Sequence, residues 1–338
     1  FPPAWAFLAE PRHIRPRTFF AILAPWGPAD SRDLDRLCHA REGGHPRANG
    51  PLPVCRAPHH DAQMDSRFRG NDSFPDIAFA AGRRTVPVLR ALKAASPGTF
   101  TIFLGNPRAI RHGADAIWAP AHDALTGQHV IATLTTPHPY SATVLAALRE
   151  NPDPRIAALP KPLCGVLIGG TSRHHRFGGA DCTALLDAVT SIRAQGCGVA
   201  ATVSRRTPQA LAAALRSILS ADPGAFLWEG EGENPYGSIL ACANSLIVTA
   251  DSTNMVSEAV ATRAPVHLFE PSGGHPRLTR LLDRLLATGR VRRWAGVPDC
   301  WPVEPLDATP QVAAELARRL EAFQQARGGR VVEAAPSH

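Results

Sequence analysis

Several kinds of residue and segment are scarce in this sequence, and each scarcity excludes a class of protein. Only 6% of the 338 residues are Phe, Trp or Tyr, so the aromatic side chains that stack on bases are mostly missing, and we expect no nucleic-acid partner. The longest apolar stretches, such as 19–26, fall well short of the roughly 18 residues that span a bilayer. We therefore expect no transmembrane helix.

Cysteine patterns typical of metal or disulfide sites are also missing. The seven cysteines are an odd number, are widely spread and include no CxxC pair, which argues against a zinc ribbon or a disulfide framework. The first 26 residues have no basic segment followed by a continuous apolar core, so no secretory signal is expected. These features favour a reducing, cytoplasmic setting and no bound metal.

The net charge is basic and is due almost entirely to arginine. Lys and Arg number 36 against 29 Asp and Glu, a net charge of +7, and lysine occurs only at positions 93 and 161. Such a balance suits phosphate-bearing ligands, nucleic acid or an anionic membrane face. With 44% hydrophobic and 19% charged residues, the chain can bury a sizeable core, and its length predicts two domains of about 150 residues each.

From residue 75 onward, short apolar runs alternate with helical segments in two series. In the first, strands are expected at 76–81, 100–104, 116–119 and 130–134, with helices at 86–95 and 141–149. In the second, strands are expected at 165–168, 199–203, 226–228, 245–249 and 266–269, with helices at 182–194, 208–219, 236–243, 254–262 and 278–287. Because buried strands that alternate with helices form parallel sheets covered on both faces, the pattern predicts an α/β protein with two Rossmann-like domains facing a cleft.

Composition sets the expected domain limits. A proline-rich bridge at 151–162 is predicted to link an N-terminal domain, 1–150, to a C-terminal domain, 163–325, and a disordered tail is expected at 326–338. Residues 38–73 have no helical or strand period and resemble translated palindromic repeat elements, so we expect a disordered insertion there. The spacing of its histidines and cysteines matches no standard metal site.

The sharpest motif is TADSTNMVSEA, where a strand ends and small polar residues open a helix. Exposed N–H groups and the positive end of the helix dipole make such a junction a phosphate site. Glu258, about one and a half turns into the helix, is placed to accept hydrogen bonds from a ribose diol. The alternative is an ordinary strand and helix with Asp251 or Ser252 as N-cap and Glu258 in solvent. Composition alone does not decide between the phosphate site and the ordinary strand and helix.

Three further strands end in residues of a similar kind. The sequence GGTS at 169–172 follows one strand, SRRT at 204–207 the next, and a Glu-rich loop with Asn234 and Tyr236 the one after. The glycines let backbone amides approach a ligand, although a tight turn is the alternative for GGTS. Since parallel strands end at one edge of the sheet, where open α/β sheets bind ligands, the four loops predict one binding site.

These motifs also carry a family resemblance. The stretches GGTSRHHRF, SRRTP, EGENPY and DSTNMVSEA, with others in order over roughly 74–294, resemble the mitochondrial-fission (elongated mitochondria) family, whose bacterial members are described as glycosyltransferases. The resemblance implies a GT-B-like fold, in which the second domain holds a nucleoside-diphosphate sugar and the first supplies the acceptor surface. It also implies a reaction without metal or cofactor, because GT-B enzymes commonly stabilise the departing diphosphate with helix dipoles and cations.

The resemblance further implies roles for single residues. Glu258 would hold the donor ribose, and Arg205 or Arg206 would offset the charge of the leaving diphosphate. The residues expected to bind the donor are Gly169, Gly170, Thr171, Ser172, Ser204, Arg205, Arg206, Thr207, Asn234, Tyr236, Asp251, Ser252, Asn254, Met255, Ser257 and Glu258, with Ser252, Asn254 and Met255 at the diphosphate. His122 is the candidate base for the acceptor hydroxyl, with Asp123 orienting its imidazole; the alternative is a capping Asp beside a surface His.

Two features concern the acceptor side. Family members usually begin with a further strand and a glycine-containing loop, so the first domain is expected to be truncated. Arginines between 277 and 293 accompany five leucines on a predicted helix, and a basic amphipathic helix can rest on anionic lipid. This would suit a lipid-linked or cell-envelope acceptor at the periphery of the inner membrane. The alternative is that the leucines face the core and the arginines are solvated.

Two other classes of function are alternatives to a glycosyltransferase. An NAD-dependent epimerase, the older description of the family, needs a GxGxxG loop and usually a Tyr-x-x-x-Lys pair; neither is present, and this class is excluded. A non-catalytic nucleotide-binding or scaffold protein of the same fold remains the alternative to a glycosyltransferase.

Overall fold

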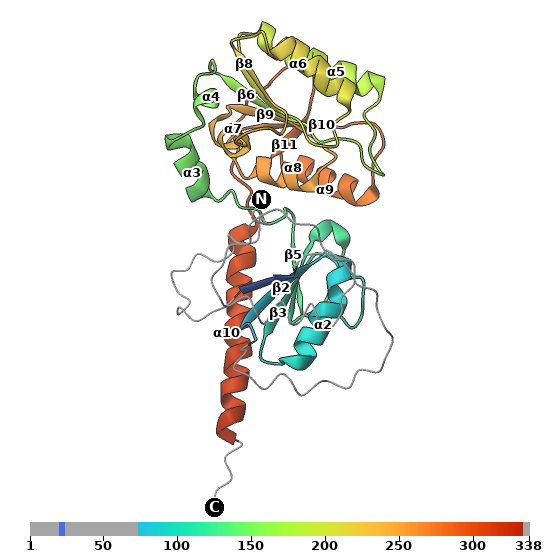
Figure 1. Ribbon diagram of the computed structural model, residues 1–338, viewed down its shortest axis with the longest axis vertical. Coiled ribbons are helices and arrows are strands. Elements are labelled where there is room, and N and C mark those ends of the chain that lie inside the picture. The colour runs from blue at the N-terminus through green and yellow to red at the C-terminus, as the bar shows by residue number, and fades with distance from the viewer. Residues whose placement is uncertain (1–19, 24–73, 334–338) are drawn as a thin grey trace, which may run out of the picture. The chain divides into compact units, whose positions relative to one another are not determined.

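The computed structural model describes residues 20–23 and 74–333 of the chain, with side chains from 74 to 327. The chain divides into two compact units and contains two β-sheets (Figure 1). Pairing is parallel throughout the six-stranded sheet and between neighbouring strands from β1 to β4 in the five-stranded sheet. The predicted α/β class with parallel sheets is therefore confirmed.

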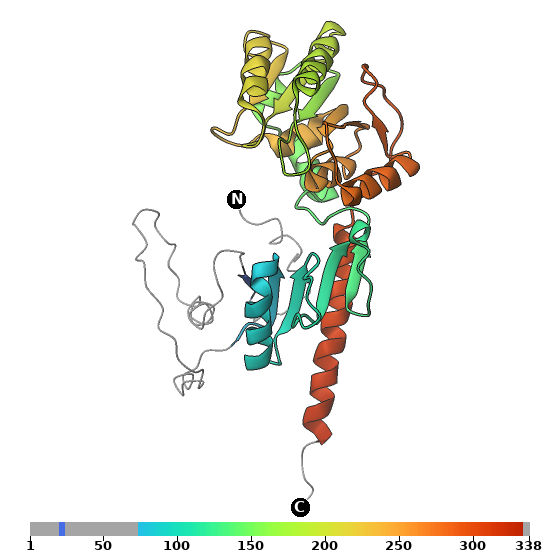
Figure 2. The same cartoon turned by 90° about the vertical axis from the view of Figure 1, so that its right-hand side faces the viewer.

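The five-stranded sheet has the strand order β1-β2-β3-β4-β5. Its strands are β1 (Phe20–Leu23), β2 (Ile77–Ala81), β3 (Phe100–Leu104), β4 (Ala116–Pro120) and β5 (Val130–Thr133), with the short helices η2 (Arg83–Thr85) and η3 (Ala121–Asp123). Every residue of β3 is buried, as is typical of a strand covered on both faces. Helix α2 (Val86–Ala95) lies along one face and the C-terminal part of α10 (Thr309–Glu333) along the other (Figure 2).

Helix α10 starts in the second unit and, from Arg319 onward, packs with the first. There the ring of Phe323 lies 5.3 Å from that of Phe100. The expected second domain, 163–325, therefore extends too far. The part of the expected disordered tail that is described, 326–333, is helical instead, as a continuation of α10 beyond the turn that the ring contact anchors.

The six-stranded sheet has the order β11-β10-β9-β6-β7-β8. Its strands are β6 (Leu163–Leu167), β7 (Gly198–Thr202), β8 (Ala225–Trp228), β9 (Ser245–Thr249), β10 (Val266–Phe269) and β11 (Val291–Arg293). The chain starts at β6, proceeds outward to β8, then returns to β9 on the other side of β6. The direction of winding reverses between β6 and β9, and open α/β sheets bind ligands at the carboxyl ends of strands at such a reversal.

The helices of the second unit cover both faces of this sheet (Figure 1). They are α5 (Gly179–Ala194) and α6 (Gln209–Leu219) on one face, and α7 (Tyr236–Cys242), α8 (Thr253–Val260) and α9 (Pro276–Ala287) on the other. Within β6, Val166 packs with the α5 and α6 core while Leu167 packs with the opposite core. Because successive side chains point to opposite faces, a strand buried on both sides forms an unbroken apolar run.

Residues 131–162 belong to the second unit. Helices α3 (Ala142–Glu150) and α4 (Pro154–Ala157) bury Leu145 and Ile156 in the same core as α7. The expected boundary at 150 and the expected linker at 151–162 are therefore wrong. Pro154 lies in the first turn of α4, with Asp153 as its N-cap, so proline here starts a packed helix rather than forming an extended bridge.

Of the helices that the structure describes, none is both long enough and apolar enough to cross a membrane. The expected insertion at 38–73 and the last residues of the expected tail, 334–338, lie outside the described residues. The predicted truncation of the first domain stays a prediction.

Candidate functional site

The loops after β6 and β9 meet at the carboxyl edge of the six-stranded sheet, at the reversal point, and Asp251 joins them. The Gly170 N–H donates to Oδ2 of Asp251 at 3.0 Å, and the Thr249 hydroxyl donates to Oδ1 at 2.7 Å. The Asp251 side chain has no solvent exposure. This carboxylate therefore binds the loops together, and Ser252 rather than Asp251 is the N-cap of the helix that follows.

The two glycines after β6 allow this close approach. A Cβ on Gly169 would lie 2.3 Å from Oδ1 of Asp251, and a Cβ on Gly170 would lie 2.1 Å from the carbonyl carbon of Arg206. Both distances are far below van der Waals contact, so any larger residue would separate the loops. The GGTS stretch is thus more than an isolated tight turn, because its backbone packs against two other loops.

The loop after β7 joins the same assembly. The Ser204 hydroxyl donates to the Gly169 carbonyl at 2.7 Å, and the Thr207 hydroxyl donates to the same oxygen. In return the Thr171 N–H donates to the Arg206 carbonyl at 2.9 Å. Ser204 and Thr207 therefore fix the backbone of the edge, and their hydroxyls are already used.

The two adjacent arginines of this loop have different roles. The Arg206 guanidinium lies 3.5 Å from Oδ2 of Asp251 and its side chain is half exposed, so it partly neutralises that buried carboxylate. Arg205 is exposed, and no hydrogen bond or ion pair of its side chain occurs within the described part of the chain. Arg205 is thus the cation of this loop that remains available for an anion.

Helix α8 begins at the same edge. Ser252 is its N-cap, and its hydroxyl accepts from the Met255 N–H at 3.4 Å. Further along, the buried Ser257 hydroxyl accepts from the Thr136 N–H at 3.0 Å, and Asn254 accepts from the Thr136 hydroxyl at 3.4 Å. Ser257 therefore holds the segment that follows β5, and its expected place among the donor-binding residues is not supported by its contacts.

Glu258 is partly buried and hydrogen bonded, unlike the solvent-exposed carboxylate of the alternative interpretation. The Tyr236 hydroxyl donates to Oε2 of Glu258 at 2.6 Å. Burial raises the pKa of Glu258 to about 7, against the opposing effect of that hydrogen bond. Burial, followed by the charge of Glu258, raises the pKa of Tyr236 well above its ordinary value.

Two neighbouring residues position the tyrosine. Oδ1 of Asn234 accepts from the Tyr236 N–H at 3.0 Å, and the Tyr140 ring lies 5.7 Å from the Tyr236 ring. Asn234 thus acts on the backbone at the start of α7, while Tyr140, from the segment before α3, packs on the side chain.

Ser172 forms a local turn with the residues after it. Its hydroxyl accepts from the N–H of His174 at 3.2 Å and from that of His175 at 3.1 Å. His175 is buried, and its pKa is lowered mainly by burial, with the charge of Asp251 acting in the opposite direction. Ser172 therefore shapes the loop after β6.

Sequence reasoning missed four residues of this region. Thr249 and His175 lie inside stretches that the motifs already covered, so a closer interpretation of those motifs would have included them. Thr136 and Tyr140 come from the segment between β5 and α3, more than ninety positions before their partners, and no local signal marks them.

The side chains of His122 and Asp123, the predicted base and its orienting group, are not hydrogen bonded to each other. The Asp123 carboxylate pairs with Nη1 of Arg277 at 3.1 Å. His122 is buried, and its Nδ1 has no hydrogen-bond partner among the described residues. Burial lowers the pKa of His122, and the charge of Asp123 only partly opposes this. The imidazole is therefore favoured in its neutral form, but Asp123 does not hold it.

The arginines of the basic tract are largely used within the second unit. Arg280 donates to the His122 carbonyl at 2.9 Å. Arg290 is buried and donates to backbone carbonyls at the end of α8, including that of Thr262 at 2.7 Å. The leucines at 278, 281, 282 and 285 are buried. The leucine face of α9 thus lies in the core, as the alternative interpretation held, and membrane contact stays a prediction.

Among the residues with described side chains, no group of three or more His, Cys, Asp or Glu side chains is placed to hold a metal ion. The expectation of a metal-independent protein remains a prediction.

Comparison with solved structures gives weak overall likenesses. UDP-GlcNAc 2-epimerase from Methanocaldococcus jannaschii is 12% identical, with 73% of this chain and 69% of that chain covered and a TM-score of 0.43. MurG from Acinetobacter baumannii is 14% identical, with 74% and 70% covered and a TM-score of 0.38.

Sequence comparison gives a closer relation. The Arabidopsis thaliana "Mitochondrial fission protein ELM1" is 28% identical over 275 residues, which cover 73% of this chain and 64% of the plant protein. The chain thus spans less than two thirds of that relative. A family model described as "Mitochondrial fission ELM1" matches residues 5–320. On this match over most of its length, the chain belongs to the mitochondrial fission ELM1 family.

Proposed function

We propose that this protein is a GT-B-type glycosyltransferase that moves a sugar from a nucleoside-diphosphate sugar to a hydroxyl acceptor without a metal, in the bacterial cytoplasm. The observation that carries the proposal is the joined edge at the reversal point, where the loops after β6, β7 and β9 are held together by Asp251. An edge fixed in this way is preorganised, so a ligand need not order it on binding.

The donor diphosphate would lie at the start of α8. The amide groups of the first turn and the helix dipole favour a negative charge there, and Arg205 supplies an exposed cation on the neighbouring loop. The negative charge of Asp251 does not oppose this, because Arg206 and two hydrogen bonds offset it. Arg205 would then stabilise the charge that develops on the departing diphosphate.

The donor ribose would be held by Glu258. Its carboxylate is fixed by the Tyr236 hydroxyl at 2.6 Å, which leaves the group in one orientation. A ribose diol offers two O–H donors, and a carboxylate accepts both. Glu258 is thus assigned to the ribose and Tyr236 to the positioning of Glu258.

For the acceptor we assign His122 as the general base. Its pKa is lowered by burial, so the imidazole is neutral at physiological pH and able to take the proton of an acceptor hydroxyl. A lipid-linked or cell-envelope acceptor is proposed, with the protein at the inner membrane, on the basis of the basic residues of α9 such as the exposed Arg284.

Ligand-dependent unfolding tests the donor site. A nucleoside diphosphate or its sugar at about 100 times its dissociation constant should stabilise the fold by about 2.7 kcal/mol. UDP, GDP, CDP and ADP would be compared on the wild type, Glu258→Gln, and the matched control Glu304→Gln, since Glu304 is exposed. A shift with one nucleotide that weakens only in Glu258→Gln is expected. No shift with any nucleotide would overturn the donor site.

A non-catalytic nucleotide-binding or scaffold protein is the second candidate. One observation favours it: Asp123 is paired with Arg277 and nothing described holds Nδ1 of His122, so the base lacks an orienting partner. Donor-sugar hydrolysis and transfer to lipid extracts distinguish the two functions. Nucleotide binding without release of sugar from any donor would support the scaffold.

A further inference from the structure

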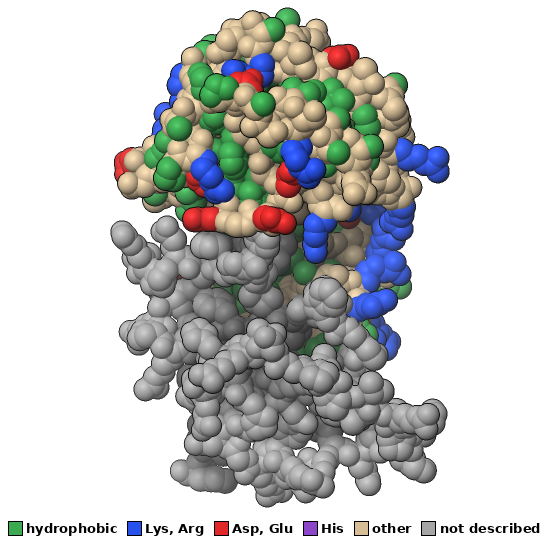
Figure 3. All heavy atoms as spheres, turned by 45° about the horizontal axis from the view of Figure 1, so that its top comes forward, with side chains coloured by type: hydrophobic (Ala, Val, Ile, Leu, Met, Phe, Trp, Pro, Cys, Tyr) green, Lys and Arg blue, Asp and Glu red, His purple; other side chains and the backbone are tan. Residues whose placement is uncertain are grey.

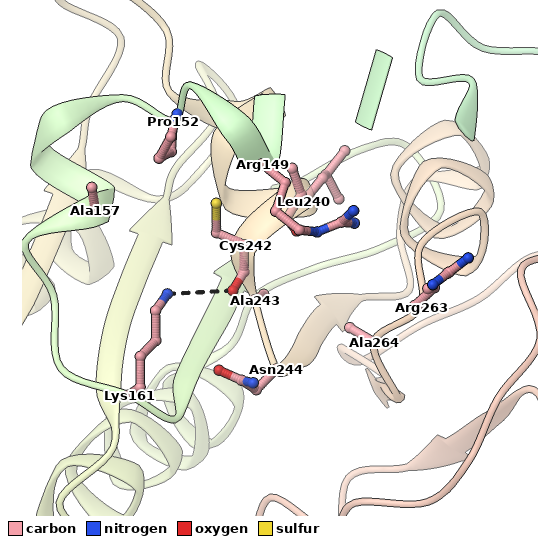
Figure 4. Close-up of a pocket in the computed structure, with 11 residues that line it drawn as sticks. Arg149, Pro152, Ala157, Lys161, Leu240, Cys242, Ala243, Asn244, Arg263 and Ala264 are labelled. Atoms are coloured by element: carbon pink, nitrogen blue, oxygen red, sulfur yellow. Dashed lines mark hydrogen bonds between the residues drawn. The ribbon is translucent and has the colours of Figure 1, made fainter. Parts of the chain in front are cut away.

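The opposite edge of the six-stranded sheet contains a separate hollow. It has a volume of about 710 Å³ and lies where the chain enters β6, β9 and β10. Its lining residues are Arg149, Pro152, Ala157, Lys161, Leu240, Ala241, Cys242, Ala243, Asn244, Arg263 and Ala264 (Figure 4). A volume of this size is within the range of about 300–1,000 Å³ that is usual for small-ligand pockets.

The hollow contains three cations and no acidic residue. Arg149, Lys161 and Arg263 line it, from three separate segments of the chain. Nε of Arg149 donates to the Ala241 carbonyl at 3.0 Å, and Nζ of Lys161 donates to the Cys242 carbonyl at 3.4 Å. Both cations are therefore held at the wall of the hollow by backbone carbonyls. Because these acceptors are neutral, the positive charges of the two side chains remain uncompensated.

Arg263 has even fewer contacts. It is exposed, and no hydrogen bond or ion pair of its side chain occurs within the described part of the chain. Figure 4 shows it on the opposite side of the hollow from Lys161. Asn244 adds an orientated amide, because its Oδ1 accepts from the Leu163 N–H at 2.8 Å and its NH₂ group remains available.

Many other cations of the second unit are paired with a carboxylate. Basic side chains adjoin acidic ones at several places on the face shown in Figure 3. The ion pairs of this unit with described side chains include Arg155–Asp153, Arg193–Asp222, Arg216–Glu229, Arg277–Asp123, Arg292–Asp299 and Arg293–Glu270. The hollow is lined by three cations, and among the described side chains none of them has a carboxylate within ion-pair distance. An anion in the hollow would therefore be attracted by uncompensated positive charge.

We propose that this hollow binds a phosphate-bearing small molecule. Two guanidinium groups and an ammonium group match phosphate oxygens in charge and hydrogen-bonding geometry. The apolar part of the wall, Leu240 with Ala157 and Pro152, accepts an uncharged part of the same ligand. The concave shape favours a small molecule over a flat membrane surface.

Calorimetry with pyrophosphate on the full chain tests the site. Arg263→Gln should weaken pyrophosphate binding about tenfold, whereas Arg84→Gln, the same change at an exposed arginine of the first unit, should have no effect. The Arg205→Gln variant separates this site from the proposed donor site. If pyrophosphate binds at the donor site instead, its affinity should fall in Arg205→Gln and stay unchanged in Arg263→Gln. Equal affinities for wild type and Arg263→Gln would overturn the proposal.

Cys242 provides a second measurement within the hollow, because it lines the wall and is partly exposed, while Cys300 is an exposed reference. The ratio of the alkylation rate with anionic iodoacetate to the rate with neutral iodoacetamide should be larger at Cys242 than at Cys300. Pyrophosphate should slow the alkylation of Cys242 and leave that of Cys300 unchanged. Binding of pyrophosphate that leaves the alkylation rate of Cys242 unchanged would contradict the proposal. So would binding only to vesicles of phosphatidylcholine and phosphatidylglycerol, which would assign the cations to a lipid surface.

Discussion

The two edges of the six-stranded sheet use charge in opposite ways. At the carboxyl edge, Asp251 is fully buried, and a backbone N–H, a hydroxyl and the Arg206 guanidinium offset its charge. At the amino edge, Arg149, Lys161 and Arg263 surround a hollow with no carboxylate among its lining residues. A buried charge that is compensated within the fold fixes the geometry of a site, at a cost in desolvation. A charge that is left uncompensated in a surface hollow indicates that a bound ligand supplies the opposite charge.

The difference predicts that replacing a compensated residue such as Asp251 lowers stability, whereas replacing an uncompensated cation such as Arg263 lowers ligand affinity and leaves stability unchanged. Removing a group that is already paired leaves its buried partners unsatisfied, which is costly. Removing an unpaired exposed cation leaves nothing unsatisfied in the fold.

Asp251→Ala should destabilise the protein by about 3 kcal/mol, because it leaves the Gly170 N–H, the Thr249 hydroxyl and the Arg206 charge without their acceptor. Urea unfolding measures the change, with Arg263→Gln at the other edge expected to stay within about 0.5 kcal/mol of wild type. Similar losses in both variants would remove the contrast between the edges.

Glu258 should make stability depend on pH. Its pKa is raised from 4.5 unfolded to about 7 folded, so the folded state holds the proton more tightly. The stabilisation is complete below the unfolded pKa and is lost as the pH rises through about 7, an effect of about 3 kcal/mol.

Urea unfolding between about pH 5 and about pH 8 follows this loss. Glu258→Gln cannot ionise and keeps an acceptor for the Tyr236 hydroxyl, so its stability should change less over the same interval than that of the wild type. Identical pH profiles for the two proteins would contradict the raised pKa.

Arg205→Gln should leave the free energy of unfolding within about 0.5 kcal/mol of wild type and should weaken nucleoside-diphosphate binding about tenfold. The reason is that Arg205 is exposed without a described partner. Arg216→Gln, which breaks an exposed pair with Glu229, is the comparison: it should leave nucleotide affinity unchanged. Unaltered affinity in Arg205→Gln would remove this residue from the site.

Ser257→Ala should cost about 1 kcal/mol, because the buried Thr136 N–H loses its acceptor. Ser220→Ala, whose hydroxyl donates to the Arg216 carbonyl at an exposed helix end, should cost less. Thermal unfolding of the two variants measures both losses of stability. If Ser257→Ala loses no more stability than Ser220→Ala, the Thr136 contact contributes little.

Much of the second unit could be predicted from the sequence because its elements are coded locally. The run at 245–249 is apolar and buried, and the strand β9 occupies those same residues. The Gly169-Gly170 pair was predicted to let the backbone approach a ligand, and in the structure both glycines make room for other loops, because a Cβ there would meet Asp251 or the Arg206 backbone. Such features depend on residues a few positions apart, so periodicity and turn chemistry indicate them.

Assignments that depend on distant partners could not be made in this way. The sequence placed Arg205 and Arg206 together, and only the position of Asp251 separates an exposed cation from a partly neutralised one. Likewise, the pattern at 141–149 predicted a helix, but the burial of Leu145 beside α7 assigns α3 to the second unit.

The sequence by itself determined the alternation of strands and helices, the parallel α/β class and the four polar strand ends. Tertiary structure alone decided which polar groups are satisfied by one another and which remain for a ligand. It also brought Arg149, Lys161 and Arg263 to one hollow, although more than a hundred positions separate the first from the last. The physical reason is that local patterns act over one or two turns, whereas burial and charge compensation depend on every residue that the folded chain places within a few ångströms.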